Sequence, residues 1–130
     1  MQVLIRSLVG AAGAAAAALA ALTWAFPERI AAALGLSAAG SLGSLGAATM
    51  RADIAGFFAV IGALSLAAAW RASPRLLTAP TAMIAVALSG RALTLALNGY
   101  TPALVGPMAI EGALLAVFAG GRALIKDART

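Results

Sequence analysis

Four ionisable side chains lie within or beside long apolar stretches, and they are the residues best placed to do chemistry in this chain. Arg91 lies near the middle of "ALSGRALTLALNG", and Glu111 lies in "IEGAL". Arg51 and Asp53 both lie in "MRADIAGFF", at the start of another apolar run. A guanidinium keeps its proton even in apolar surroundings, so Arg91 requires a polar partner or water.

The composition removes most other kinds of chemistry. The chain has neither cysteine nor histidine, which excludes disulfides, thiolate nucleophiles, Cys or His metal sites, His-ligated haem and a Ser-His-Asp triad. We therefore expect no metal site and no cofactor. The net charge is +5, but the basic residues are scattered and have few aromatic residues between them, so we expect no nucleic-acid partner.

The apolar content indicates a membrane protein. Hydrophobic residues make up 63% of the 130 residues and charged residues 10%, against about 45–50% and about 25% in soluble domains. A membrane crossing needs about 20 apolar residues, which leaves room for four. We predict an all-α fold, a four-transmembrane-helix bundle with antiparallel neighbours. It forms one domain (1–130) with helices at about 4–26, 52–70, 76–97 and 103–122 and an outer loop at 27–50.

The region 27–50 is too rich in glycine and serine for another crossing. Its first part, "PERIAAALGL", predicts two helical turns that begin at Pro27 and end near Gly35. The glycines at 40, 43 and 46 indicate a flexible loop outside the membrane. They lack the preceding strand and the lysine of a phosphate-binding loop.

Basic residues predict the orientation, because cytoplasmic loops carry an excess of lysine and arginine. With four crossings, the two termini and the 71–75 connection share one side, which holds Arg6, Arg71, Arg75, Arg122, Lys126 and Arg129. The other side has Arg29 and Arg51. Both termini are therefore expected in the cytoplasm, in a multi-pass protein of a bacterial inner membrane. As an alternative for the first segment, a signal peptide cleaved at "ALA" (18–20) stays open.

Depth along the helices suggests a partner for Arg91. Arg91 lies six residues before Leu97, roughly 9 Å below the outer boundary, and Glu111 lies roughly 10 Å into the next helix. Arg51 and Asp53 lie somewhat above them on a neighbouring helix, and Asn98 is two turns from Arg91 on the same face. We predict one polar cluster, with two positive and two negative charges, made of Arg51, Asp53, Arg91, Glu111 and Asn98.

Such a cluster has three interpretations. It can fix helix register and orientation only, or it can form a ligand pocket or ion path, since ionisable residues inside a membrane are candidates for function. Alternatively, Arg91 extends to the headgroups and takes no part in a cluster.

Three stretches carry a family resemblance. Arg51, Asp53 and Gly56 match an Arg-x-acid-x-x-Gly pattern, although a glutamate is expected where Asp53 stands. Gly90–Arg91 and Glu111 match the rest of the pattern. Over nearly its whole length the chain resembles a bacterial family of small four-helix membrane proteins of unknown function, distantly similar to DoxX-like proteins. The resemblance implies a four-helix inner-membrane protein and no particular activity.

The residues leave three functions open. The first is an accessory or structural membrane subunit, with the lipid bilayer and another membrane protein or a second copy as partners. The second is a binder or transporter of a small amphiphilic or anionic ligand, in which Arg91 attracts the anion and Glu111 or Asp53 carries a proton. The third is an enzyme that uses Asp53 and Glu111 as acid and base, which the small set of reactive residues disfavours.

Overall fold

A computed structural model describes residues 1–36 and 43–126, and in these ranges the chain is helical and has no strand. The helical elements follow in the order α1 (Gln2–Ala25), α2 (Pro27–Ala33), α3 (Gly43–Thr49), η1 (Met50–Ile54), α4 (Ala55–Arg71), η2 (Pro74–Leu77), α5 (Thr78–Asn98), η3 (Pro102–Leu104) and α6 (Val105–Leu124). An all-α fold is confirmed.

In the described part of the chain, four continuous helical segments are long and apolar enough to cross a membrane, which indicates a multi-pass membrane protein. They are Gln2–Ala25, Gly43–Arg71, Pro74–Asn98 and Pro102–Leu124. The shortest has 23 residues and is therefore roughly 35 Å long, against a hydrocarbon thickness of about 30 Å. Helices satisfy their own backbone hydrogen bonds, as a segment in lipid must.

The second of these segments starts earlier than the sequence predicts. We expected a loop up to residue 50, but α3 continues through η1 into α4 without a break. Alanines at 47 and 48 favour the helix, and the two glycines of α3 only weaken it. The first part of the expected loop is helical as predicted, because α2 begins at Pro27 and a left-handed Gly35 follows it. Gly40 lies outside the described residues.

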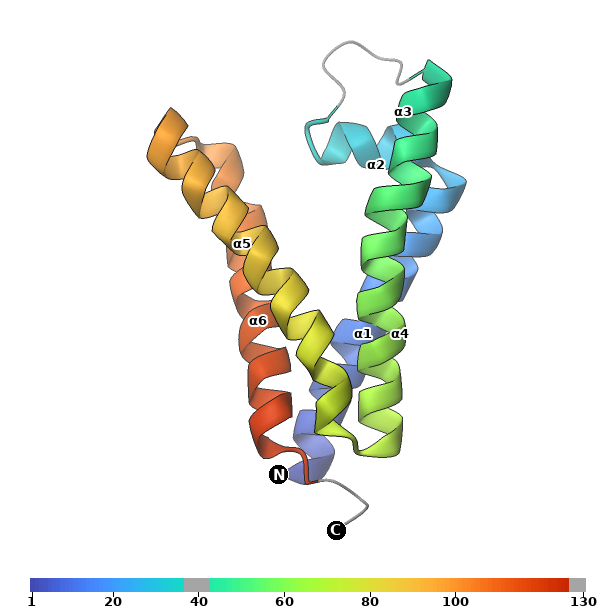
Figure 1. Cartoon of the computed structure of the whole chain (residues 1–130), viewed down its shortest axis with the longest axis vertical. Coiled ribbons are helices and arrows are strands. Elements are labelled where there is room, and N and C mark those ends of the chain that lie inside the picture. The colour runs from blue at the N-terminus through green and yellow to red at the C-terminus, as the bar shows by residue number, and fades with distance from the viewer. Residues whose placement is uncertain (37–42, 127–130) are drawn as a thin grey trace.

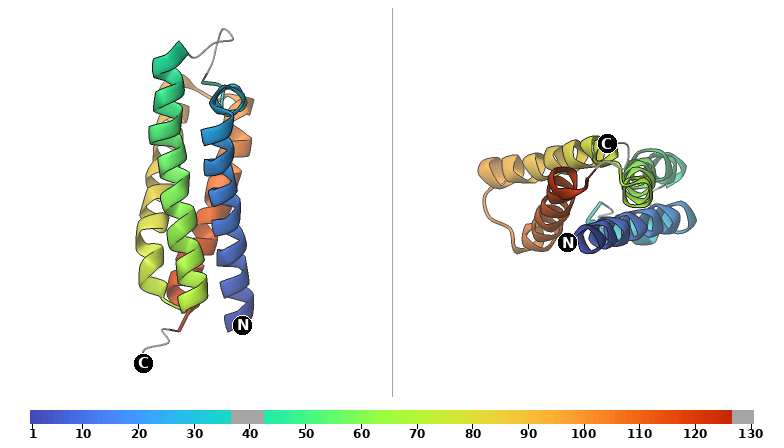
Figure 2. Two further views of the ribbon diagram at one scale, coloured as in Figure 1. Left: turned by 90° about the vertical axis from the view of Figure 1, so that its right-hand side faces the viewer. Right: turned by 90° about the horizontal axis from the view of Figure 1, so that it is seen from below.

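The helices form two pairs that diverge from one end of the molecule (Figure 1). Helix α1 packs along α4, and α5 packs with α6; the pairs meet near the N-terminus and separate toward α2 and η3. A quarter-turn of the molecule and the view from below show the same two pairs (Figure 2). The result is a four-helix bundle that is closed at one end only.

Glycines bring α1 and α4 into close contact. A Cβ atom at Gly62 would lie 2.7 Å from the Ala17 backbone nitrogen, and one at Gly13 would lie 2.9 Å from the Leu66 backbone nitrogen. Both distances are too short for any side chain, so this contact requires glycine on both helices. Small residues permit such backbone approach between membrane helices.

The closed end holds the common core of the two pairs. Val9 of α1, Ile61 of α4, Leu77 of η2, Ile84 of α5 and Phe118 of α6 belong to one buried cluster. Both pairs contribute to this core, so it joins them at the closed end.

Polar contacts close the same end. Arg6 donates hydrogen bonds from Nε to the Ala69 carbonyl (2.7 Å) and from Nη2 to the Trp70 carbonyl (2.9 Å). These carbonyls belong to the last turn of α4, where the helix itself offers no donor. Gln2 accepts a bond from the Lys126 backbone nitrogen (3.1 Å), so the N-terminus and Lys126 lie together.

Candidate functional site

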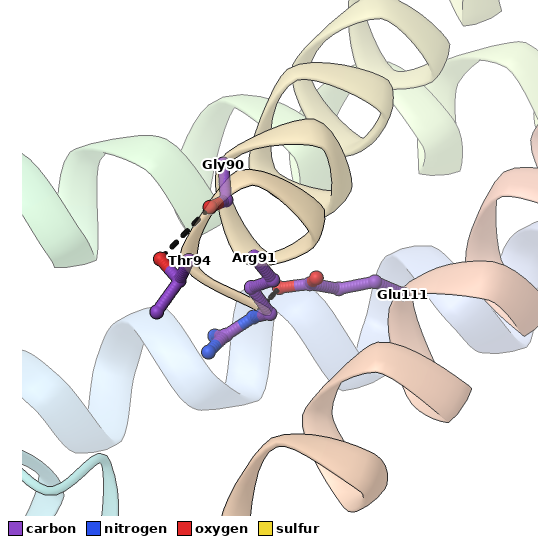
Figure 3. Close-up of polar contacts among 4 residues, drawn as sticks. All are labelled: Gly90, Arg91, Thr94 and Glu111. Atoms are coloured by element: carbon purple, nitrogen blue, oxygen red, sulfur yellow. Dashed lines mark hydrogen bonds and ion pairs between the residues drawn. The ribbon is translucent and has the colours of Figure 1, made fainter. Parts of the chain in front are cut away.

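An ion pair joins α5 and α6 within their apolar spans. Arg91 Nε donates to Glu111 Oε1 over 2.8 Å (Figure 3). Arg91 lies seven residues before the end of α5 and Glu111 six residues after the start of α6, which places each roughly 9–11 Å inside its helix. The two helices run in opposite directions, so these equal depths bring the side chains to one level.

The pair leaves hydrogen-bonding groups unused on both partners. Within residues 1–36 and 43–126, neither Nη1 nor Nη2 of Arg91 has an acceptor, and Glu111 Oε2 is buried without a donor. The terminal nitrogens of Arg91 point away from the carboxylate (Figure 3). Thr94, one turn further on, donates to the Gly90 carbonyl of its own helix (3.0 Å) and so gives the pair no support.

The two partners differ in exposure. The side chain of Arg91 is 33% exposed and that of Glu111 is 13% exposed. Arg91 is therefore the more accessible member of the pair, and Glu111 is the more deeply buried member.

A cavity of about 440 Å³ lies between the two helix pairs, and both members of the ion pair line it. Arg91 and Glu111 are the ionisable residues of its wall; the others are alanine, leucine, isoleucine, phenylalanine, glycine and proline. The wall residues come from both helix pairs and from α2, and the larger ones include Leu19, Leu34, Phe57, Phe58, Ile61 and Leu114. The volume falls in the range of about 300–1,000 Å³ typical of small-molecule sites, which are also mostly apolar with few polar groups.

Two phenylalanines in the cavity wall could not be identified from the sequence as lining residues. Phe57 and Phe58 both face the cavity, and their rings meet edge to face with centroids 5.2 Å apart and an interplanar angle of 89°. No pattern in the sequence distinguishes an apolar cavity wall from an apolar lipid-facing surface, because both need the same residue types.

The predicted five-residue cluster does not form. Arg51 donates from Nε to the Trp24 carbonyl (3.0 Å), and Trp24 Nε1 donates to the Arg51 carbonyl (3.0 Å). Arg51 is therefore bound to the end of α1 and lies in the α1–α4 pair, whereas Arg91 lies in the α5–α6 pair. An arginine close to free carbonyls at a helix C-terminus has donors enough to satisfy them, so it needs no carboxylate.

Asp53 and Asn98 also lie apart from the ion pair. Both side chains are exposed, and in the described part of the chain neither makes a hydrogen bond or salt bridge. Asp53 belongs to η1, a π-helical stretch whose wider turn rotates its side chains away from the α-helical expectation. Asn98 is the last residue of α5, where the two helix pairs are furthest apart.

Acidic side chains do not gather into a larger group within the described ranges. No three His, Cys, Asp or Glu side chains gather there, so no metal centre is evident within them. Asp53 is exposed and is not among the residues that line the cavity with Glu111, so the two carboxylates expected to act as acid and base do not share that cavity.

Comparison of the chain with known proteins does not assign it to a family. No protein-family model, curated protein or solved structure matches the chain. The resemblance to the DoxX-like group therefore stays a prediction from the motifs around Arg51, Arg91 and Glu111.

Proposed function

We propose that this membrane protein binds an amphiphile, an apolar chain with an anionic head, in the cavity between its two helix pairs. The single observation behind the proposal is the position of Arg91. Arg91 lines an apolar cavity, and two nitrogens of its guanidinium have no acceptor among the described residues. Nη1 and Nη2 can donate together to a sulfate, phosphate or carboxylate head.

The wall supports the choice of an apolar tail. Leucine, isoleucine and phenylalanine side chains would enclose a hydrocarbon chain but offer it no hydrogen bond. A hydrophilic anion would leave this surface in contact with its hydration water, so the cavity favours a ligand that is charged at one end only. The volume of about 440 Å³ suits a single chain.

The proposal includes a location and an orientation. The closed end of the bundle has Arg6, Arg71, Arg75, Arg122 and Lys126, whereas the open end has Arg29 and Arg51. By the excess of positive charge on cytoplasmic sides, the closed end and both termini lie in the cytoplasm of a bacterial cell and the cavity lies in the opposite half of the inner membrane.

Binding of decyl sulfate tests the proposal. The protein is reconstituted in phosphatidylcholine nanodiscs, and empty nanodiscs correct for partitioning into lipid. We expect Arg91→Gln to weaken binding at least about tenfold, since a bond to a charged partner contributes about 1.5–3 kcal/mol. Arg122→Gln, which removes an exposed arginine of α6 at the opposite end, is the control and should bind as the wild type does.

Two further ligands separate the contributions of head and tail. Decanol, which has the tail but no charge, should bind to the wild type and to Arg91→Gln with equal affinity. Inorganic sulfate, which has the charge but no tail, should not compete with decyl sulfate. Adding phosphatidylglycerol to the nanodiscs shows whether anionic bilayer lipids occupy the same site, in which case decyl sulfate binding weakens. Equal affinity of wild type and Arg91→Gln for decyl sulfate would refute the proposed function.

A second candidate function, an accessory subunit of a larger membrane assembly, is favoured by the exposure of α6. Only 6% of its apolar span is buried within the chain, against 28% for the first span, so lipid or another protein must cover the rest. Cross-linking in native membranes followed by purification in mild detergent tests this candidate. Recovery of the chain as a monomer without cross-linked partners would count against it.

A further inference from the structure

We infer that the cavity takes up its anion together with one proton, and that Glu111 accepts this proton. The inference rests on the proposed function and names the ionic state in which the ligand is held. It makes the protein a proton-coupled binder of anionic amphiphiles. It follows from a count of the charges at the cavity wall.

The cavity has no net charge before the anion enters. Arg91 and Glu111 form an ion pair, and the wall contributed by α1, α2 and α4 has no ionisable side chain. Among the acids and bases of neighbouring elements, Arg51 is fastened to Trp24, and Asp53 is exposed and does not line the cavity. An anion beside Arg91 would therefore give the site a net charge of −1.

A net negative charge in these surroundings is unfavourable. Isolated charges lose most of their hydration in an apolar environment, and one cation shared by two anions compensates only one of them. No second cation faces the cavity from any described element. A proton is then the simplest counter-charge that can reach the site.

The geometry selects Glu111 as the group that accepts the proton. Among the described residues, its carboxylate accepts one hydrogen bond, from Arg91 Nε to Oε1, and Oε2 is buried without a donor. When Nη1 and Nη2 of Arg91 donate to an anionic head, the single guanidinium serves two anions, and no donor in the described ranges is left for Glu111 Oε2. The proton passes from bulk water to the Glu111 carboxylate, the anion accepts hydrogen bonds from Arg91, and no covalent bond between heavy atoms is made or broken.

Titration calorimetry with decyl sulfate measures this proton directly. Decyl sulfate stays ionised at neutral pH, so any proton taken up belongs to the protein. Binding enthalpies are compared at one pH in two buffers that differ in ionisation enthalpy, with the protein in phosphatidylcholine nanodiscs. The wild type should take up about one proton per ligand, and its affinity should fall about tenfold per pH unit in the range where the free site is unprotonated.

Two variants test whether Glu111 is the group that takes up the proton. Glu111→Gln should bind decyl sulfate with no proton uptake and with an affinity independent of pH, because the site is already neutral once the anion is bound. Glu28→Gln, which removes an exposed carboxylate of α2, should behave as the wild type does.

The outcomes distinguish this inference from the proposed function. Binding that depends on Arg91 but takes up no proton in the wild type would overturn the inference and leave the proposed function standing. Proton uptake that persists in Glu111→Gln would overturn the assignment to Glu111. Absence of Arg91-dependent binding would overturn both. Because the wild-type measurement alone can contradict proton uptake, the test does not depend on the folding of a variant.

Discussion

At the scale of single residues, the ion pair between Arg91 and Glu111 satisfies one buried charge with another. Glu111 is the more deeply buried partner, and within residues 1–36 and 43–126 the one hydrogen bond to its side chain comes from Arg91. Removal of the arginine alone would leave a carboxylate in apolar surroundings. Removal of both charges would leave two apolar helices that can still pack.

This difference predicts a non-additive effect on stability. We expect Arg91→Met to lower the free energy of unfolding by about 2 kcal/mol, less than for a fully buried pair because the arginine is partly exposed. The double variant with Glu111→Leu should recover most of the loss. Unfolding by titration with urea in dodecyl maltoside micelles measures the stability of the two single variants and the double variant, and additive effects would show that the two charges do not interact.

The sequence predicted this ion pair from depth alone, and depth also explains where the prediction was wrong. Counting residues from a helix end gives the level of a side chain, but not the helix it faces. Arg51 has a suitable level, yet it bonds to the Trp24 carbonyl on the other helix pair. The π-helical turn at Met50–Ile54, which redirects Asp53, leaves no mark in the residue pattern.

At the scale of elements, the tightest packing is the contact between α1 and α4. Gly62 lies against Ala17, and Gly13 lies against Ser65 and Leu66. By contrast, Gly112 on α6 has no neighbouring atom within 4 Å of an added Cβ. These glycines therefore have different roles, although each lies in an alanine-rich helix.

Alanine substitutions distinguish the two kinds of glycine. Gly62→Ala should lower the free energy of unfolding by about 1–3 kcal/mol, because its Cβ would lie 2.7 Å from the Ala17 nitrogen. Gly112→Ala is the matched control and should be neutral or slightly stabilising, since alanine favours a helix over glycine. The same micelle titration compares them; equal effects would contradict the close contact of α1 with α4.

The boundaries of elements were predicted well where composition changes abruptly, and less well elsewhere. Pro27 marks the start of α2, and the "NGYTP" turn separates α5 from η3. The start of the second span at Gly43 was missed because glycine and serine are typical of loops. Here the helix is continuous with α4, and such continuity has no local signature.

At the scale of the whole molecule, two helix pairs joined at one end produce the cavity. The core around Leu77 and Phe118 holds the pairs together, while toward η3 they separate (Figure 1). The number and type of the helices could be predicted from apolar composition and length. The divergence of the pairs could not, because it depends on which side chains interlock across the bundle.

The proposed orientation predicts the side on which each connection is exposed. The chain has no cysteine, so Thr101→Cys and Thr78→Cys each introduce one thiol, at exposed positions near opposite ends of α5. In intact spheroplasts, an impermeant maleimide should label Thr101→Cys, and it should label Thr78→Cys only after permeabilisation. The reverse pattern would place the cavity in the cytoplasmic half of the membrane.

Solid-state NMR of the protein with bound decyl phosphate tests whether Arg91 receives an anionic head in the cavity. Dipolar dephasing between arginine ¹⁵Nη and ligand ³¹P nuclei reports whether the two are in contact. We predict dephasing in the wild type at hydrogen-bonding range that disappears in Arg91→Gln and persists in Arg122→Gln. Dephasing that is unchanged in Arg91→Gln would place the phosphate at another arginine and contradict the account.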